Sequence, residues 1–287
     1  MFIHPVFWLW FAGLVFLSAG LIAARKELAA ATGLDRWIAL GPVFVAAPLA
    51  VFAAEHFVLA NSMEQMVPAW LPARLFWVYF VGCAWLAAAI SLVTTKLLRL
   101  SATLLGVMFL LIVFTVHLPN AISNPGDRLG WIVALRETAF AGGAWALAGT
   151  GKRTWMALFG RFSMAIAAIY FGLDELLHPQ FTPGVPDTKL TPSWVPLHAL
   201  WGYPAGVFLL VAGAALIFKF KPRIAAASIG IFMTLLTLFL FVPILALTRD
   251  PSQMTEGINF VADTLMFGGA AFLVAAGVFL PAIMGRP

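Results

Sequence analysis

The chain has 287 residues, of which 62% are hydrophobic and only 10% are charged. Soluble domains usually carry about 25% charged residues, so this chain has too few polar side chains to cover a soluble surface. The formal charge of +5 does not indicate nucleic-acid binding, because the basic residues fall in short segments between hydrophobic runs. The single cysteine, Cys83, excludes an internal disulfide, a CxxC redox pair and a covalent CxxCH haem site.

The hydrophobic runs predict an all-α polytopic transmembrane bundle with about nine spans. A helix that rises about 1.5 Å per residue needs roughly 20 apolar residues to cross a hydrocarbon core of about 30 Å. The first run is interpreted as a retained span, because no basic residue precedes it and no convincing signal-peptide cleavage site precedes Arg25. The predicted spans cover approximately residues 6–24, 37–60, 74–95, 100–119, 131–149, 157–178, 199–218, 223–247 and 258–282.

The distribution of basic residues predicts the orientation. Twelve lysines and arginines follow odd-numbered spans and four follow even-numbered spans. Because cytoplasmic loops are the basic ones, we expect a bacterial inner-membrane protein with its N-terminus outside and its C-terminus in the cytoplasm. The twelve are Arg25, Lys26, Arg36, Lys96, Arg99, Lys152, Arg153, Arg161, Lys219, Lys221, Arg223 and Arg286, and the four are Arg74, Arg128, Lys189 and Arg249.

An internal repeat runs through most of the chain. The segment PAWLP at 68–72 recurs as PSWVP at 192–196, a shift of 124 residues, and nearby shifts align Glu137 with Asp263 and Glu55 with Asp174. The shift of 124 also matches Trp77 with Trp201, Tyr79 with Tyr203, Gly82 with Gly206, Arg99 with Arg223, Gly106 with Gly230 and Pro119 with Pro243.

The repeat divides the chain into three parts. Residues 1–36 form an N-terminal transmembrane helix and a cytoplasmic loop, residues 37–150 form a first four-helix unit, and residues 151–287 form a second. Four is an even number of spans, so both units are expected to face the same way, as parallel and not inverted repeats.

The repeated features resemble the DoxX-like membrane family. Each unit has an acid late in its first helix, Glu55 or Asp174, and an outer loop that ends in P-x-W-x-P. A basic turn at Arg99 or Arg223 then precedes a last helix with an acid ahead of paired glycines. The resemblance covers spans 2–9 and implies a double-DoxX protein with a role in membrane redox work, such as thiosulfate–quinone oxidoreduction or partnership with a secreted redox enzyme. The family has no single catalytic signature, and the lone Cys83 argues against thiol exchange.

Ionisable residues inside the spans are the strongest functional candidates, because each costs several kcal/mol unless it is paired or hydrated. The predicted orientation places all of them toward the outer face, in two vestibules, one per unit. The candidates for cofactor binding are Glu55, His56, His117, Arg136, Glu137, His198 and Trp201, and the candidates for catalysis are Asp174, Glu175, His178 and Asp263.

The second unit is expected to hold the working site, because its spans contain three acids and no buried arginine to offset them. Asp174 and His178 share a helical face at spacing i, i+4. We expect Glu175, His198 and Asp263 to join them in one outward-opening pocket. Two carboxylates in one apolar pocket cannot both ionise cheaply, which suits proton exchange.

The first unit contains a cation, Arg136, that is expected to pair with Glu55 across two helices. The adjacent Glu137 points about 100° away on the helix and cannot fill the same pocket.

Structural interpretations of these residues stay open. The buried acids can brace helix packing, and the histidines can bond loop carbonyls. Carboxylate and imidazole groups can hold zinc, copper or iron, but Arg74 stands where the second unit has His198, so no symmetric metal site is predicted. His56 and His117 are possible axial haem ligands. The aromatic residues of the outer loops predict an interfacial belt, and the paired glycines predict close helix packing.

Three functions are consistent with this pattern. A redox-associated subunit would hold a quinone or another amphipathic molecule in an outward-facing pocket, with the bilayer and a membrane or periplasmic redox protein as partners. A carrier or exporter is the alternative, although its polar site would be expected near the midplane. The third is a scaffold that anchors a partner enzyme.

The orientation can be tested with reporter fusions. Fusions after Arg25, Lys152 and Lys219 are expected to report cytoplasm, because each site follows an odd-numbered span. An external signal at any of the three would contradict the nine-span topology.

Overall fold

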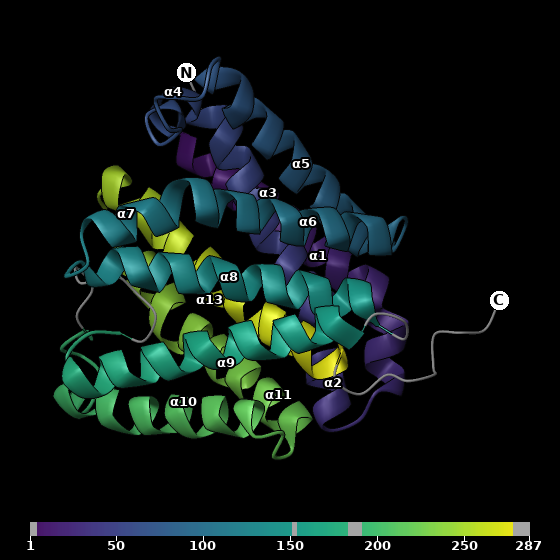
Figure 1. Ribbon diagram of the computed structural model, residues 1–287, viewed down its shortest axis with the longest axis vertical. Helices are drawn as coiled ribbons and strands as arrows, with labels where there is room; N and C mark the ends of the chain where they lie inside the picture. Colours follow the sequence, from purple (N-terminus) through teal and green to yellow (C-terminus); the bar gives the residue numbers. More distant parts are fainter. Residues whose placement is uncertain (1–4, 151–153, 183–190, 278–287) are drawn as a thin grey trace.

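The computed structural model describes residues 5–150, 154–182 and 191–277, and these form a bundle of helices (Figure 1). Seven helices are long and apolar enough to cross a membrane by length and composition. These helices are characteristic of a membrane protein. Two further helices, α8 and α10, occupy predicted spans without meeting those limits, because α10 has only 16 residues and α8 carries Arg128, Arg136 and Glu137.

The chain forms its helices in the following order, with two segments in which the helix widens into π geometry. They are α1 (Pro5–Ala30), α2 (Leu34–Ile38), α3 (Gly41–Val58), α4 (Ala60–Glu64), α5 (Arg74–Thr94), α6 (Leu98–Ile112), the π segment Val113–His117, α7 (Leu118–Ser123), α8 (Arg128–Gly149), α9 (Thr154–Leu177), a 3₁₀ turn (His198–Leu200), α10 (Gly202–Ile217), α11 (Pro222–Leu236), the π segment Thr237–Phe241, α12 (Val242–Leu247) and α13 (Pro251–Gly277).

Each predicted span coincides with a helical segment, and the differences lie at the ends. The first helix continues to Ala30, so Arg25 and Lys26 are helical and not in a loop; the backbone turns only near Gly33, which has a φ of 54°. The fifth begins at Arg128, because the side chain of Asp127 caps it. Predicted features at Lys152, Arg153, Lys189, Arg286 and residues 278–282 lie outside the described residues.

The helices pack so that the two predicted units are interleaved. We call residues 37–150 the first half and residues 154–277 the second half. The first helix of each half packs on the last helix of the other, α3 on α13 and α9 on α8, and α8 and α13 also pack on each other. Figure 1 shows α8, α9 and α10 side by side with α13 behind α8. The extra helix α1 packs mainly on α3. Buried side chains at the centre of the molecule therefore come from both halves.

The same local backbone recurs 124 residues apart. The indole N–H of Trp77 donates to Pro72 O at 3.0 Å, and that of Trp201 donates to Pro196 O at 2.6 Å. Among the described residues other than glycine, six have positive φ, and they form three pairs at this spacing: Ala73 with Leu197, Thr95 with Lys219, and Leu97 with Lys221.

Both π segments precede a proline. Val113–His117 leads into Pro119 and Thr237–Phe241 leads into Pro243, again 124 residues apart. A proline inside a helix removes one hydrogen bond and clashes with the carbonyl four residues earlier, and a widened turn relieves the clash. In the first half, this widened turn positions His117.

The paired glycines allow close helix packing, as predicted. A Cβ on Gly143 would lie 2.7 Å from Ala270 Cα, and a Cβ on Gly269 would lie 2.9 Å from the carbonyl carbon of Phe44. These contacts bring α8 against α13 and α13 against α3.

The substitution Gly143→Ala is therefore expected to destabilise the protein by about 1–3 kcal/mol, because its methyl group meets backbone atoms that cannot move aside. Thermal unfolding in detergent measures the effect. Gly126→Ala is the control, since a Cβ there has no atom within 4 Å. Equal unfolding temperatures for the two variants would contradict the close α8–α13 contact.

Candidate functional site

Most of the ion-paired side chains within the helices gather in two clusters between the halves. The central cluster consists of Glu55, His117, Arg136, Glu137, Asn259 and Asp263. The Arg128 cluster consists of Arg128, Asp174 and Glu175. Arg128 and Arg136 are eight residues apart on α8, which places the two clusters about 12 Å apart along that helix. Arg161 is separate from both clusters: it lies inside α9, is 5% exposed, and is 4.6 Å from the centroid of the Phe162 ring. The expectation that the spans of the second half hold no buried arginine is therefore wrong.

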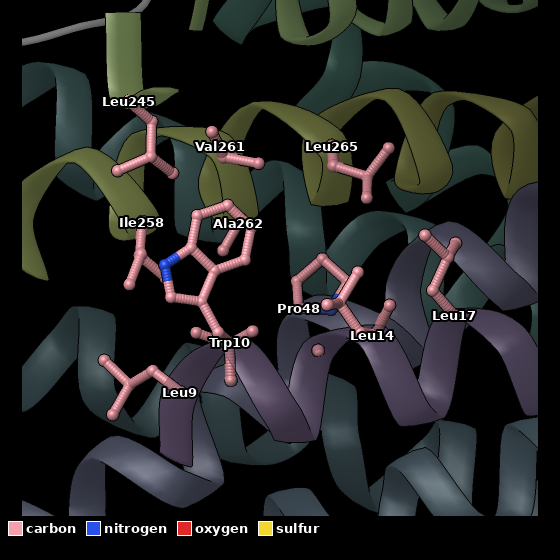
Figure 2. A pocket seen from close by; sticks show the side chains of 13 residues that line it. Leu9, Trp10, Leu14, Leu17, Pro48, Leu245, Ile258, Val261, Ala262 and Leu265 are labelled. Atoms are coloured by element: carbon pink, nitrogen blue, oxygen red, sulfur yellow. The ribbon is translucent and has the colours of Figure 1, made fainter. Parts of the chain in front are cut away.

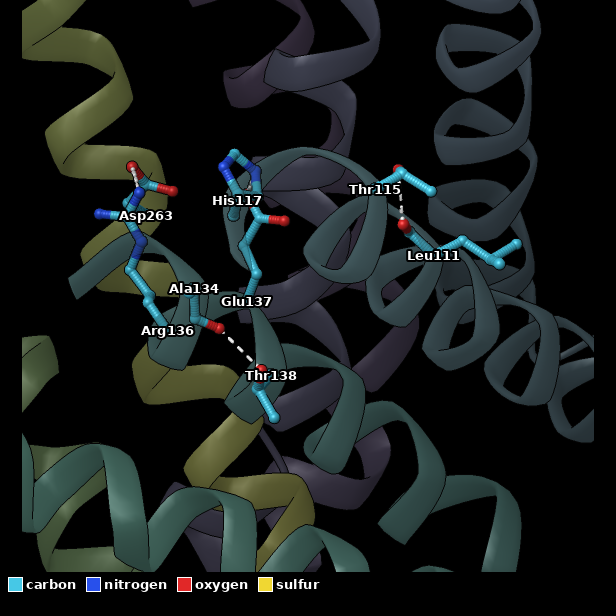
Figure 3. Close-up of polar contacts among 8 residues, drawn as sticks. All are labelled: Leu111, Thr115, His117, Ala134, Arg136, Glu137, Thr138 and Asp263. Atoms are coloured by element: carbon cyan, nitrogen blue, oxygen red, sulfur yellow. Dashed lines mark hydrogen bonds and ion pairs between the residues drawn. The ribbon is translucent and has the colours of Figure 1, made fainter. Parts of the chain in front are cut away.

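Two ion pairs form the middle of the central cluster (Figure 3). Arg136 Nη2 lies 2.8 Å from Asp263 Oδ2, which joins α8 to α13. His117 Nε2 lies 3.0 Å from Glu137 Oε1, which joins the first π segment to α8. All four side chains are only 11–17% exposed. Arg136 and Glu137 are adjacent on α8, and their side chains point about 100° apart around the helix, so each binds a partner from a different segment, as predicted.

Glu55 completes the cluster from α3. Its Oε1 accepts a hydrogen bond of 2.9 Å from the side-chain amide of Asn259 on α13. The predicted pair between Arg136 and Glu55 is therefore wrong, because Asp263 takes the guanidinium instead. The reason is the interleaved packing, which brings α13 of the second half between α3 and α8.

The Arg128 cluster joins α8 to α9. Arg128 donates two hydrogen bonds to Asp174, from Nε at 2.7 Å and from Nη2 at 2.6 Å. The guanidinium also lies over the ring of Phe181, 4.8 Å from its centroid. Glu175 is 1% exposed, and neither of its carboxylate oxygens has a hydrogen-bond partner.

The predicted convergence of five residues in one pocket of the second half is also wrong. Asp174 binds Arg128, whereas Asp263 binds Arg136, and these two arginines are about two turns apart on α8. His178 is half-buried with its ring edge toward Phe181, and His198 is exposed.

The other two candidates for cofactor binding lie apart from both ion-pair clusters. His56 Nδ1 donates to Phe52 O at 2.8 Å, with its ring edge-on to Trp85. Trp201 is 55% exposed beside its loop. Among the described residues, neither side chain forms a hydrogen bond or ion pair with the clustered acids, so each is a packing or loop residue in this arrangement.

Sequence reasoning missed two residues of the clusters. Arg128 was placed in a loop, although the preceding Asp127 is a residue that commonly begins a helix. Asn259 was not considered, although it lies four residues before Asp263 and so on the same helical face.

An apolar groove lies next to the central cluster. It has a volume of about 440 Å³ and is lined by α6, α7, α8, α9 and the first π segment. Three of its lining residues, Val113, Phe114 and Leu118, flank His117 in sequence, and two others, Ala134 and Thr138, flank Glu137. Phe114 is 61% exposed, so the groove is reached from the surface that would face lipid.

A second, smaller pocket of about 90 Å³ lies between α1, α3, α12 and α13 (Figure 2). Its side chains are apolar and include Trp10, Pro48 and Val261. Within the described residues, no group of three or more His, Cys, Asp or Glu side chains is placed to hold a metal ion.

The comparisons with known proteins give one match. A family model described as Domain of unknown function (DUF8561) matches residues 45–140, about a third of the chain, from within α3 to within α8. No curated protein and no solved structure matches the chain.

Asp263→Asn is expected to destabilise the protein by about 3–5 kcal/mol, because it leaves the buried Arg136 without its carboxylate. Asp35→Asn is the control: Asp35 also pairs with an arginine, Arg223, but it is 55% exposed, so a loss of at most about 1 kcal/mol is expected.

Chemical unfolding in detergent compares the two variants. An equally small loss for both would contradict a buried Arg136–Asp263 pair.

Proposed function

We propose that the protein is a multi-pass inner-membrane protein of nine spans, built from two parallel DoxX-like units and an additional first helix. Two observations support a duplicated architecture: the sequence repeat, and the recurrence of turns and π segments at a spacing of 124 residues. The basic residues after odd-numbered spans support an outside N-terminus.

We further propose that the protein is a redox-associated subunit that binds a quinone or another amphipathic molecule in the groove beside His117. The observation that carries this proposal is the pairing of a lipid-facing apolar groove with a partly exposed imidazole–carboxylate pair. A volume of about 440 Å³ falls within the range of small-molecule sites, which are mostly apolar with a few polar groups.

His117 and Glu137 do not line the groove themselves, but each is flanked in sequence by residues that do, and their imidazole–carboxylate pair would suit a carbonyl headgroup that takes up protons. His117 Nε2 contacts Glu137 Oε1, and the other carboxylate oxygen, Oε2, is buried without a hydrogen-bond partner among the described residues. An imidazole and a carboxylate in contact can pass a proton to a bound molecule. The indoles of Trp131 and Trp145 already donate to backbone carbonyls, so their rings supply apolar surface to the groove.

The second half lacks the equivalent site. At the repeat spacings, Phe241 stands where the first half has His117, and Phe260 stands where it has Ala134. Both phenylalanines are buried, with ring centroids 6.2 Å apart. Large rings therefore occupy the region that corresponds to the groove and its imidazole. This difference favours the first half as the binding site, in place of the second half that the sequence suggested.

Binding can be tested by filling the groove. We expect Ala134→Phe to weaken binding of a short-chain quinone at least about tenfold, because the ring occupies the space of the ligand, as Phe260 does in the second half. Tenfold corresponds to about 1.4 kcal/mol. Tryptophan fluorescence of the detergent-purified protein measures binding, and analysis of extracted lipids shows whether a quinone copurifies. Ala87→Phe, at an exposed alanine of α5, is the matched control.

A second variant, Glu137→Gln, keeps the shape of the groove and removes the carboxylate, so it too is expected to weaken binding. Unchanged affinity in both variants would exclude the groove. A wild-type protein that neither copurifies with nor binds a quinone would overturn the redox proposal. Substrate flux in liposomes would then favour the carrier, and a copurifying enzyme would favour the scaffold.

A further inference from the structure

Glu175 is a buried acid with no direct polar partner among the described residues. It lies two residues before the end of α9, inside a candidate membrane span, and it is 1% exposed. Both carboxylate oxygens are buried without a hydrogen-bond partner. An isolated buried carboxylate loses its hydration and gains nothing in return, so the ionised form is strongly disfavoured at such a position.

The cation nearest to Glu175 is already bound. Arg128 makes its two-bond contact with Asp174, the adjacent residue, and interacts with Glu175 only through space. The single guanidinium of Arg128 is therefore the cation near both carboxyl groups, but it is hydrogen-bonded to only one of them, that of Asp174. If both carboxyls were ionised, the cluster would carry a net negative charge inside the bundle.

The other helices packed on α9 offer no further cation. The segment Gly202–Ile217 of α10 contains no Asp, Glu, Lys, Arg or His. On α13, Asp263 is bound to Arg136, and on α11 the only basic residue, Arg223, is bound to Asp35. Among the described residues that directly follow α9, His178 comes one turn after Asp174 and is half-buried.

We propose that Glu175 binds a proton and forms, with Asp174 and Arg128, a proton-exchange site separate from the groove. In one form of the proposed site, Arg128 keeps the two hydrogen bonds to Asp174 that the structure shows, and Glu175 carries the proton. In the alternative, the proton moves from Glu175 to Asp174 as Arg128 transfers its two hydrogen bonds to Glu175. The number of protons and the total charge are the same in both, so the exchange needs no other reactant.

This inference does not depend on quinone binding, because its residues do not line the groove. The test is the infrared absorption of a protonated carboxylic acid, recorded at neutral pH on the detergent-purified full chain. A difference spectrum between wild type and Glu175→Gln isolates the contribution of one residue. We expect a protonated-carboxyl band in the wild type that is missing in this variant. Glu27→Gln, at an exposed glutamate of α1, should leave the band unchanged.

A second pair of variants tests the competition for Arg128. In Asp174→Asn, Arg128 is released to pair with Glu175, so the Glu175 band should be lost although the residue is intact. In Arg128→Gln, no arginine is left to stabilise the ionised form of Glu175, so the protonated-carboxyl band of Glu175 should persist. The proposal is overturned if wild type and Glu175→Gln give the same spectrum, since Glu175 is then ionised. It is equally overturned if the band survives in Asp174→Asn, since Arg128 then does not move between the two acids.

Discussion

The contact between α8 and α13 determines how the polar groups of this protein are arranged. Small residues let the two backbones approach closely, and the ion pair between Arg136 and Asp263 joins them in an apolar setting. A buried charge without a partner is costly, so this contact constrains which helices can neighbour α8 and α13. The first helix of each half then packs on the last helix of the other, and every buried ion pair or hydrogen bond of the two clusters joins different helices.

The interleaved packing also explains why the two halves differ chemically. The first half contributes both arginines of α8, and the second half contributes the acids that bind them. The imidazole and the open groove are found only in the first half among the described residues, whereas Phe241 and Phe260 occupy the matching region of the second. In the arrangement observed, the two arginines of α8, from the first half, are bound by acids of the second half.

Much of the fold followed from the sequence, because hydrophobic length, proline and glycine positions and repeat spacing are local properties. The predicted spans coincide with helices, and the paired glycines lie where helices approach. The pairing of side chains did not follow. The repeat aligns Glu137 with Asp263, but it carries no information on which half each helix packs against, so Glu55 was assigned to Arg136. The groove was not predicted either, since it depends on the π turn before Pro119 and on the small side chain of Ala134.

The interleaved packing of the halves is tested most directly by cross-linking α3 to α13. The Cβ of Phe44 lies 3.0 Å from the position that a Cβ on Gly269 would take, so the two helices need to separate only slightly to reach the distance of about 3.5–4.5 Å in a disulfide. In a Cys83→Ser background, oxidation of the double variant Phe44→Cys/Gly269→Cys is expected to link the two helices, and mass spectrometry of the digested protein should recover a disulfide-joined peptide pair from α3 and α13. Thermal unfolding of the reduced double variant checks that it still folds. If the two cysteines stay reduced under conditions that oxidise exposed thiols, the first helix of one half does not pack on the last helix of the other, and the arrangement of both clusters described above would be contradicted.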